Sequence, residues 1–262
     1  MLQLSPHPVV AIVQARMGST RLPGKTLALL AGKPMLAHIL ERVQAVPLVD
    51  RVVVATTTHP EDDAIAALAR DLGVTVYRGA AEDVLDRFYR CALEARAHTI
   101  VRITADDPFK DPALLQAMLE RWIRLWPGLD YLSNTLEPTY PEGLDLEIFS
   151  MDALTRAWRE ATLPADREHV TPYIWRHPHR FRLYSWKQER DLSHLRWTVD
   201  YPEDLAFAQA VYQRLYPQKP LFLMEDILAL LEAEPHLQTL PRRVPRNEGL
   251  LRSQGLRSSP EA

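Results

Sequence analysis

Hydrophobic and polar positions follow two regular patterns along the first half of the chain. Short runs rich in β-branched residues predict buried strands, and between them apolar residues recur at three- and four-residue intervals, which predicts helices with one buried face. Strands are expected at residues 9–14, 51–56, 74–77 and 99–104, and helices at 34–46, 60–72, 84–95 and 112–124. Because strands alternate with helices, the pattern predicts an α/β fold with a parallel sheet covered on both faces.

The second half of the chain has a mixed pattern and no internal repeat. Strands are expected at 144–149, 181–186 and 195–199, and helices at 151–161, 166–176, 202–216 and 224–234. After Pro241 the periodicity ends, and residues 241–262 contain five arginines and two glutamates. We therefore predict one domain over residues 1–240, followed by a disordered, Arg-rich tail at 241–262.

Composition narrows the class of protein. The 262 residues carry a formal net charge of -3, which argues against general nucleic-acid binding because that function usually needs a basic face. Cys91 is the only cysteine in the sequence, so no internal disulfide can form and a reducing compartment is indicated. The sequence shows neither a membrane span nor the pattern of a signal peptide at MLQLSPHPVV. These features predict a soluble, cytoplasmic protein.

A basic loop follows the first strand, in the stretch AIVQARMGSTRLPGKT at residues 11–26. The end of this stretch looks like a P-loop, but five residues separate Gly18 from the pair Gly24-Lys25, whereas a P-loop has four residues between its first glycine and its Gly-Lys pair. Pro23 also lacks the N–H group that a phosphate-binding nest needs. The loop nevertheless carries three cations: Arg16, Arg21 and Lys25. Because Gly18 lets the backbone approach a ligand closely, a polyanion-binding loop is favoured over a solvated basic turn.

Acidic residues follow two later strands. Asp106 and Asp107 lie in RITADDPFKDP, and Asp200 lies in RWTVDYPEDL. The loops after parallel strands share one edge of the sheet, and Mg²⁺ is bound there by one or two carboxylates together with phosphate oxygens. Asp106 and Asp200 are therefore candidate metal ligands, whereas Asp107 fits a metal site and a structural role equally well. For Asp111 and Asp204 we predict helix capping instead.

Two further polar stretches lie between the Asp106 and Asp200 motifs in the sequence. In PEGLDLEIF, strand alternation places Asp145 and Glu147 on one face. DREHVTPYIW groups Arg167, Glu168 and His169 at the start of a predicted helix. A glutamate there also complements the helix dipole, so this stretch alone does not separate a ligand site from a structural one.

Together these stretches resemble the cytidylyltransferases that activate acidic sugars, the CMP-sialate and CMP-Kdo synthetases, and especially the SpsF-like proteins of spore-coat polysaccharide biosynthesis. The motifs occur in family order across residues 9–205: VVAIVQARMGSTRLPGKTL, VVVATT, RGAAEDVLDRF, RITADDPFKDP, PEGLDLEIF, DREHVTPYI and RWTVDYPEDL. The resemblance implies a three-layer, Rossmann-like nucleotidyltransferase fold with an α+β C-terminal part. Residues of about 8–130 would form its nucleotide half, and 131–240 its sugar and metal half.

The resemblance also implies an activity and roles for individual residues. CMP would be transferred from CTP to an oxygen of a sugar or sugar acid, and pyrophosphate would be released. The nucleotide would be bound by Ala15, Arg16, Gly18, Arg21, Lys25 and Arg87. Asp106 and Asp200 would bind Mg²⁺ and, with Arg16 and Lys25, form the catalytic group. The sugar would face Asp145, Glu147, Glu168 and His169. The family tends to form homodimers, and Trp158, Trp175, Trp186 and Trp197 offer apolar surface for one.

Two other functions fit the same stretches. A glycosyltransferase on a similar fold would use the acidic residues to hold a finished nucleotide-sugar, although three cations suit a triphosphate better than a diphosphate. A non-catalytic relative would bind nucleotide or sugar without turning it over. Release of pyrophosphate distinguishes the first activity from both alternatives.

Overall fold

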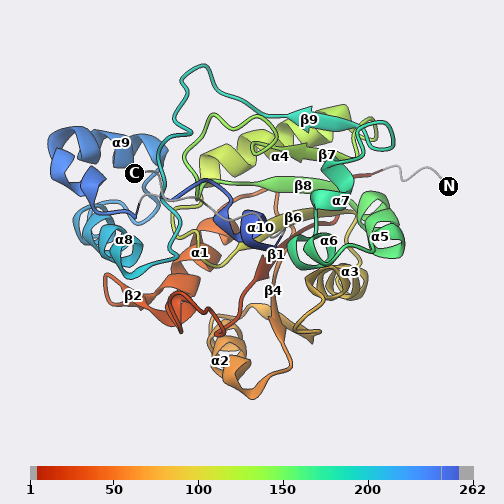
Figure 1. The fold of residues 1–262 in the computed structure, drawn as a ribbon, viewed down its shortest axis with the longest axis horizontal. Helices are drawn as coiled ribbons and strands as arrows, with labels where there is room; N and C mark the ends of the chain where they lie inside the picture. Colours follow the sequence, from red (N-terminus) through yellow and green to blue (C-terminus); the bar gives the residue numbers. More distant parts are fainter. Residues whose placement is uncertain (1–4, 243, 254–262) are drawn as a thin grey trace.

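The computed structural model describes residues 5–242 and 244–253, and a seven-stranded sheet forms its centre (Figure 1). The strands lie in the order β5-β4-β1-β6-β8-β7-β9. Their bounds are β1 Val9–Gln14, β4 Arg51–Thr57, β5 Thr75–Gly79, β6 Thr99–Thr104, β7 Tyr131–Ser133, β8 Glu147–Ser150 and β9 Leu183–Ser185. β8 runs antiparallel to β6 and β7, and the other described neighbours pair in parallel. The predicted mostly parallel sheet is confirmed.

Helices fill the connections between the strands. The long helices are α1 Met35–Gln44, α2 Asp63–Asp71, α3 Val84–Glu94, α4 Pro112–Leu125, α5 Met151–Glu160, α8 Pro202–Leu215 and α9 Met224–Ala233. Shorter elements are η1 Lys25–Leu27, η2 Pro60–Asp62, α6 Pro164–His169, α7 Pro172–Trp175, η3 Pro235–Thr239, α10 Glu248–Ser253 and the β2–β3 hairpin at Leu29–Leu30 and Lys33–Pro34. The cap predicted for Asp111 is confirmed, because its carboxylate accepts hydrogen bonds from Ala113 N and Leu114 N at the start of α4.

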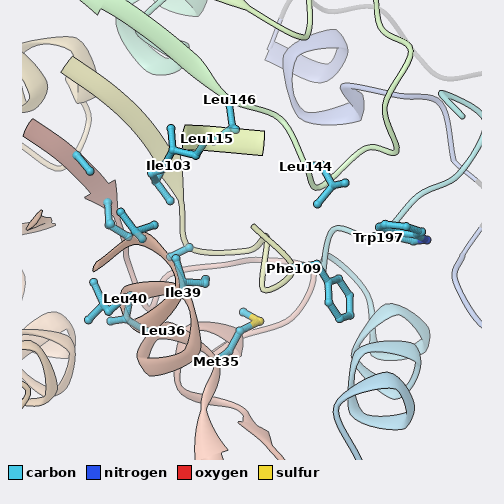
Figure 2. Close-up of a cluster of buried hydrophobic side chains, with 14 of the residues drawn as sticks. Met35, Leu36, Ile39, Leu40, Ile103, Phe109, Leu115, Leu144, Leu146 and Trp197 are labelled. Atoms are coloured by element: carbon cyan, nitrogen blue, oxygen red, sulfur yellow. The ribbon is translucent and has the colours of Figure 1, made fainter. Parts of the chain in front are cut away.

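Strand alternation divides the core into two clusters and makes the fold three-layered. Val9, Ala11 and Val13 of β1 pack into one cluster with α1, α2, α4, α8 and α9, whereas Val10 and Ile12 point to the other, which α3, α5 and α7 cover. Figure 2 shows part of the first cluster, where α1 residues such as Met35 and Ile39 gather with side chains from several distant loops. Cys91 is buried in the second cluster, and burial raises the pKa of its thiol to about 12, so the thiol is a core side chain and not a reactive group.

The register of the sheet brings three loops to one edge. Gln14, the last residue of β1, pairs with Ala55 of β4 and Thr104 of β6. The basic loop, the loop after β4 and the ADDP stretch therefore leave the sheet side by side. This is the carboxyl edge at which open α/β sheets bind ligands.

Several element predictions need correction. Residues 195–199 form no strand in the structure; they run extended, with a single bridge between Glu142 and Arg196. The helix predicted for 166–176 is split into α6 and α7, because Val170 has a φ of 73° and Pro172 cannot continue a helical hydrogen-bond ladder. β7 was not predicted, because three residues are too short for a periodic pattern.

The end of the chain also differs from the expectation. The described residues of the predicted disordered tail, 241–242 and 244–253, lie on the domain, and α10 contacts α6 (Figure 1). Charged and polar side chains hold this segment on the domain. It has few apolar residues, so its sequence shows no hydrophobic pattern that would predict a helix. Residues 243 and 254–262 lie outside the described part.

Two surface features bear on partners. Trp197 is buried, and Trp158, Trp175 and Trp186 are partly buried and pack against the two core clusters. In the described part of the chain, no helix has the length and hydropathy to cross a membrane.

Candidate functional site

The basic loop is fixed by a buried carboxylate from the neighbouring loop. Asp62, at the end of η2, is fully buried. Its carboxylate accepts hydrogen bonds from Met17 N at 2.7 Å and from Thr57 N at 3.3 Å, so it ties the loop to the end of β4. Gly24 has a φ of 72°, in the left-handed region that favours glycine, and there the loop turns into η1. The sequence analysis did not identify Asp62.

Lys25 occupies the centre of the site. Its Nζ lies 3.0 Å from Asp106 Oδ2, 2.8 Å from Asp200 Oδ1 and 2.8 Å from the carbonyl oxygen of Val199. The ammonium group donates to all three. The structure therefore brings together one cation and two carboxylates that lie 81 and 175 residues away along the chain.

Two arginines complete the network around Asp200. Arg21 donates from one nitrogen to Asp200 Oδ1 at 2.6 Å and from the other to Glu248 at 3.0 Å. Arg196 reaches Asp200 Oδ2 at 3.1 Å and Asp204 at 2.6 Å. Asp204 in turn accepts hydrogen bonds from the backbone N–H groups of Asp200 and Tyr201 at the start of α8, which confirms its predicted capping role.

Charge pairing decides the protonation states at this centre. Burial raises the pKa of Asp106, but the charge and hydrogen bond of Lys25 outweigh that effect and lower it to about 2. Burial lowers the pKa of Lys25, and the two aspartates more than compensate, so its pKa lies above the ordinary value. Asp106 and Lys25 are therefore both charged at neutral pH.

Asp107 points away from this centre. Its carboxylate lies 2.7 Å from Lys110 Nζ and 2.8 Å from Thr104 Oγ1, and its side chain is buried. The sequence did not decide whether Asp107 belongs to a metal site or has a structural role. In the structure Asp106 faces the basic loop, whereas Asp107 pairs with Lys110.

At Asp145, one of the candidate sugar residues, burial decides the direction of the pKa shift. Burial raises the pKa of Asp145 to about 6, although the Arg246 guanidinium paired with it acts in the opposite direction. Burial likewise raises the pKa of Glu142 to about 7, and Glu142 accepts a hydrogen bond from Asn247 N at 2.8 Å. Glu142 was not among the predicted residues, although it stands three positions before Asp145.

Glu147 is engaged by structural partners. Its buried carboxylate pairs with Arg102 and accepts hydrogen bonds from the hydroxyls of Tyr131 and Thr171. Burial raises its pKa, and these three partners more than offset the rise. Every oxygen of the group therefore has a partner from the protein, which leaves Glu147 less available to a ligand than Asp145.

His169 and Glu168 lie at the end of α6. Burial, followed by the charge of Arg102, lowers the pKa of His169 to about 4, so its imidazole is neutral at pH 7. Its Nε2 lies 2.9 Å from Ser253 Oγ of α10. Glu168 is exposed, with one oxygen 3.8 Å from the same nitrogen. Arg167 is turned away and binds Asp83 at the start of α3.

The remaining nucleotide candidates lie along the basic loop and beneath it. Arg16 and Gly18 are exposed, and Ala15 is buried. Within the described part of the chain, the Arg16 side chain makes no hydrogen bond or ion pair. Arg87 is buried and donates to the carbonyl oxygen of Ala80 at 2.5 Å. Burial and the nearby charge of Arg16 lower its pKa to about 10.

The donors at the centre fit a hard divalent cation. Oxygens of Asp106 and Asp200 both lie within 3.0 Å of one atom, Lys25 Nζ, so the two carboxylates converge on one point. No group of three or more His, Cys, Asp or Glu side chains in residues 5–242 and 244–253 is arranged to hold a metal ion. Two carboxylates suit Mg²⁺, which completes its coordination with waters and phosphate oxygens of a substrate.

Comparisons with known proteins agree with this geometry. The family model for cytidylyltransferases matches residues 10–227. The chain is 32% identical to the spore coat polysaccharide biosynthesis protein SpsF of Bacillus subtilis over 89% of this chain and 98% of that one. It is 41% identical to the 3-deoxy-manno-octulosonate cytidylyltransferase of Anaeromyxobacter dehalogenans over 42% and 46% of the two chains.

A solved structure shows the same fold. The structure of a cytidylyltransferase from Leptospira borgpetersenii superposes with a TM-score of 0.85 at 30% identity, covering 90% of this chain and 98% of that chain. The predicted three-layer nucleotidyltransferase fold is therefore confirmed, and so is the predicted class of enzyme. This chain belongs to the cytidylyltransferase family.

Proposed function

We propose that this chain transfers CMP from CTP to an oxygen of a sugar or sugar acid, with Mg²⁺, and releases pyrophosphate. The observation that carries the proposal is the convergence of Lys25, Asp106 and Asp200 beside the loop that bears Arg16 and Arg21. A triphosphate needs several cations, and a hard metal ion needs carboxylates; both sets meet at this edge of the sheet.

Each residue has a role in the proposed reaction. Arg16, whose side chain is exposed and has no partner among the described residues, would meet the phosphates first, and the fork of Arg21 would match phosphate oxygens. Lys25 offsets the charge that grows on the departing pyrophosphate. Asp106 and Asp200 would hold Mg²⁺, which when bound neutralises phosphate charge. The protein contributes position and charge rather than a covalent intermediate, because the α-phosphorus is attacked directly by the sugar oxygen.

The class of acceptor follows from the relatives. One is named for spore coat polysaccharide biosynthesis and another for 3-deoxy-manno-octulosonate, a sugar acid. These names support a sugar acceptor and a role in building surface polysaccharide. The cytoplasm as location and a homodimer as assembly stay predictions; sedimentation of the purified chain tests the second.

Pyrophosphate release with CTP, Mg²⁺ and a panel of sugars and sugar acids tests the proposal. Lys25→Ala is expected to lower turnover by roughly 10²–10³-fold, by analogy with the loss of one electrostatic donor. Asp200→Asn is expected to abolish turnover that depends on Mg²⁺. Lys187→Ala is the matched control, because Lys187 pairs with Glu137 at the surface, and it should leave turnover unchanged.

Two results would contradict the proposal. Near-normal turnover in Asp200→Asn, with circular dichroism showing an intact fold, would remove Asp200 from the metal site. Consumption of a nucleotide-sugar without pyrophosphate release would support the glycosyltransferase alternative instead.

A further inference from the structure

The C-terminal strap, which we define as residues 244–253, lies across the proposed site. It touches both halves of it. Arg246 pairs with Asp145, and Asn247 N donates to Glu142 at 2.8 Å. Glu248 binds Arg21 at 3.0 Å, and Ser253 Oγ lies 2.9 Å from His169 Nε2. Three of these four partners are residues for which the sequence predicted a ligand.

The strap places a carboxylate where the proposed function requires a phosphate. The Glu248 side chain is 6% exposed. Besides Arg21 it is bound by Tyr201 Oη at 2.9 Å and by Arg252 at 2.8 Å, and the guanidinium of Arg242 stands 4.4 Å from the centre of the Tyr201 ring. Two arginines, Arg21 and Arg252, thus bind a carboxylate that the chain itself supplies.

Both arms of the Arg21 fork are used in this arrangement. One nitrogen is on Asp200 and the other is on Glu248. A phosphate can take both of these positions on the two terminal nitrogens only when a carboxylate leaves. Asp200 is held from three sides, by Lys25, Arg21 and Arg196. Of the two carboxylates on Arg21, Glu248 is the one that can leave, because it moves with the ten-residue strap.

Charge decides between a strap that covers a bound nucleotide and one that competes with it. A covering strap would keep the Glu248 carboxylate beside a triphosphate, and like charges repel strongly where water is excluded. On the sugar side, the Arg246 cation likewise occupies Asp145. The strap therefore fits the ligand-free site, not a site filled with CTP.

We propose that the strap is an autoinhibitory segment: Glu248 occupies the place of a CTP phosphate at Arg21, so that nucleotide and strap compete for the site. This inference rests on the proposed function. A nucleotide that binds only the strap-open state has its apparent affinity reduced by the fraction of molecules that are open. Anything that holds the strap away would raise activity at low CTP.

Limited trypsin digestion of the full wild-type chain tests the competition. Trypsin can cut the strap after Arg246 and Arg252. The probes are CTP with Mg²⁺ and, separately, inorganic triphosphate. Ligands normally slow proteolysis by stabilising the folded state. We expect the opposite within the strap, namely several-fold faster cutting there, while the rest of the domain becomes more resistant. Slower or unchanged cutting of the strap overturns the inference.

The variant Glu248→Gln tests the charge itself. It removes the carboxylate and keeps the shape, and we expect a roughly fivefold lower Kd for CTP, the change expected from losing about one charged pair that favours the closed state. Glu232→Gln is the matched control, since Glu232 is exposed on α9, and its Kd should equal that of the wild type.

The outcomes separate this inference from the function on which it rests. Equal CTP affinity in the wild type, Glu248→Gln and Glu232→Gln, with strap cutting unaffected by CTP, overturns the strap and leaves the proposed function standing. Absence of CTP binding in all three variants overturns both. Tighter binding in Glu248→Gln alone, together with ligand-induced cutting, supports the competition.

Discussion

The pKa values of individual carboxylates at this site shift in opposite directions, because only some of these carboxylates have a cation within close contact. Asp106 has Lys25 at 3.0 Å and a pKa of about 2. The cation nearest to the Glu142 carboxylate in these pairs is Arg196, at 3.6 Å. Arg196 lies closer to Asp204 and Asp200, at 2.6 Å and 3.1 Å. Burial therefore outweighs the attraction at Glu142, and its pKa rises to about 7.

The raised pKa of Glu142 makes stability depend on pH. Between the ordinary value and about 7, the folded state holds a proton that the unfolded state releases, so stability falls as pH rises and this contribution is gone above about 7. For the ligand-free protein we expect the melting temperature to fall from pH 6 to pH 8. Glu142→Gln should flatten that fall, which amounts to about 1 kcal/mol between pH 6 and pH 8 because only about one pKa unit of the shift lies in that range.

Thermal melts at pH 6, 7 and 8 measure this effect. Glu137→Gln is the control, because Glu137 is 64% exposed and pairs only with Lys187 at the surface. If the Glu142→Gln variant loses stability from pH 6 to pH 8 as steeply as the wild type does, Glu142 is not the titrating group.

At the scale of elements, one glycine fixes how the PEGLDLEIF stretch meets the chain before Asp200. Gly143 has a φ of 106°, and a Cβ atom there would lie 2.8 Å from Thr198 N and from the carbonyl carbon of Trp197. The backbone of the two segments is joined by hydrogen bonds between Glu142 and residues 195 and 197. Only glycine permits so close an approach, which sets Glu142 beside Arg196, the residue that also contacts Asp200.

Gly143→Ala is expected to destabilise the fold by about 2 kcal/mol or more, because it adds a backbone clash to an unfavourable φ. Gly73→Ala is the matched variant: its φ is 72°, and a Cβ there meets nothing within 4 Å. It should cost only about 1 kcal/mol. Urea unfolding measures both, and equal losses would contradict the close approach as the cause.

The sequence predicted best those strands and helices whose hydrophobic pattern continues over six or more residues. β1 and β6 match their predicted bounds, and α4 and α8 differ by single residues. In the extended segment before Asp200, the alternating apolar residues predict a strand that the structure does not contain. The segment pairs only at Glu142 and Arg196, since Trp197 and Val199 pack into the core from outside the sheet.

At the scale of the whole molecule, the sequence named residues that the structure brings together at the centre of the candidate site, but not the residues around them. Asp106 and Lys25 could be found because each follows a strand end at the same sheet edge. Asp62, Glu142 and Arg196 act through contacts between distant segments, for which local patterns give no signal. The strap carries no apolar stripe that would predict a helix, because its residues bind to the domain by charge.

The most direct measurement is the melting temperature of the protein with CTP, UTP, ATP or GTP, with and without Mg²⁺. A ligand that binds only the folded state raises this temperature, so the acceptor sugar need not be known. We predict a rise that is specific for CTP and larger with Mg²⁺, and that Asp200→Asn loses the Mg²⁺-dependent part. A shift without preference for CTP, or no shift with any of the four nucleotides, would contradict the proposed reaction.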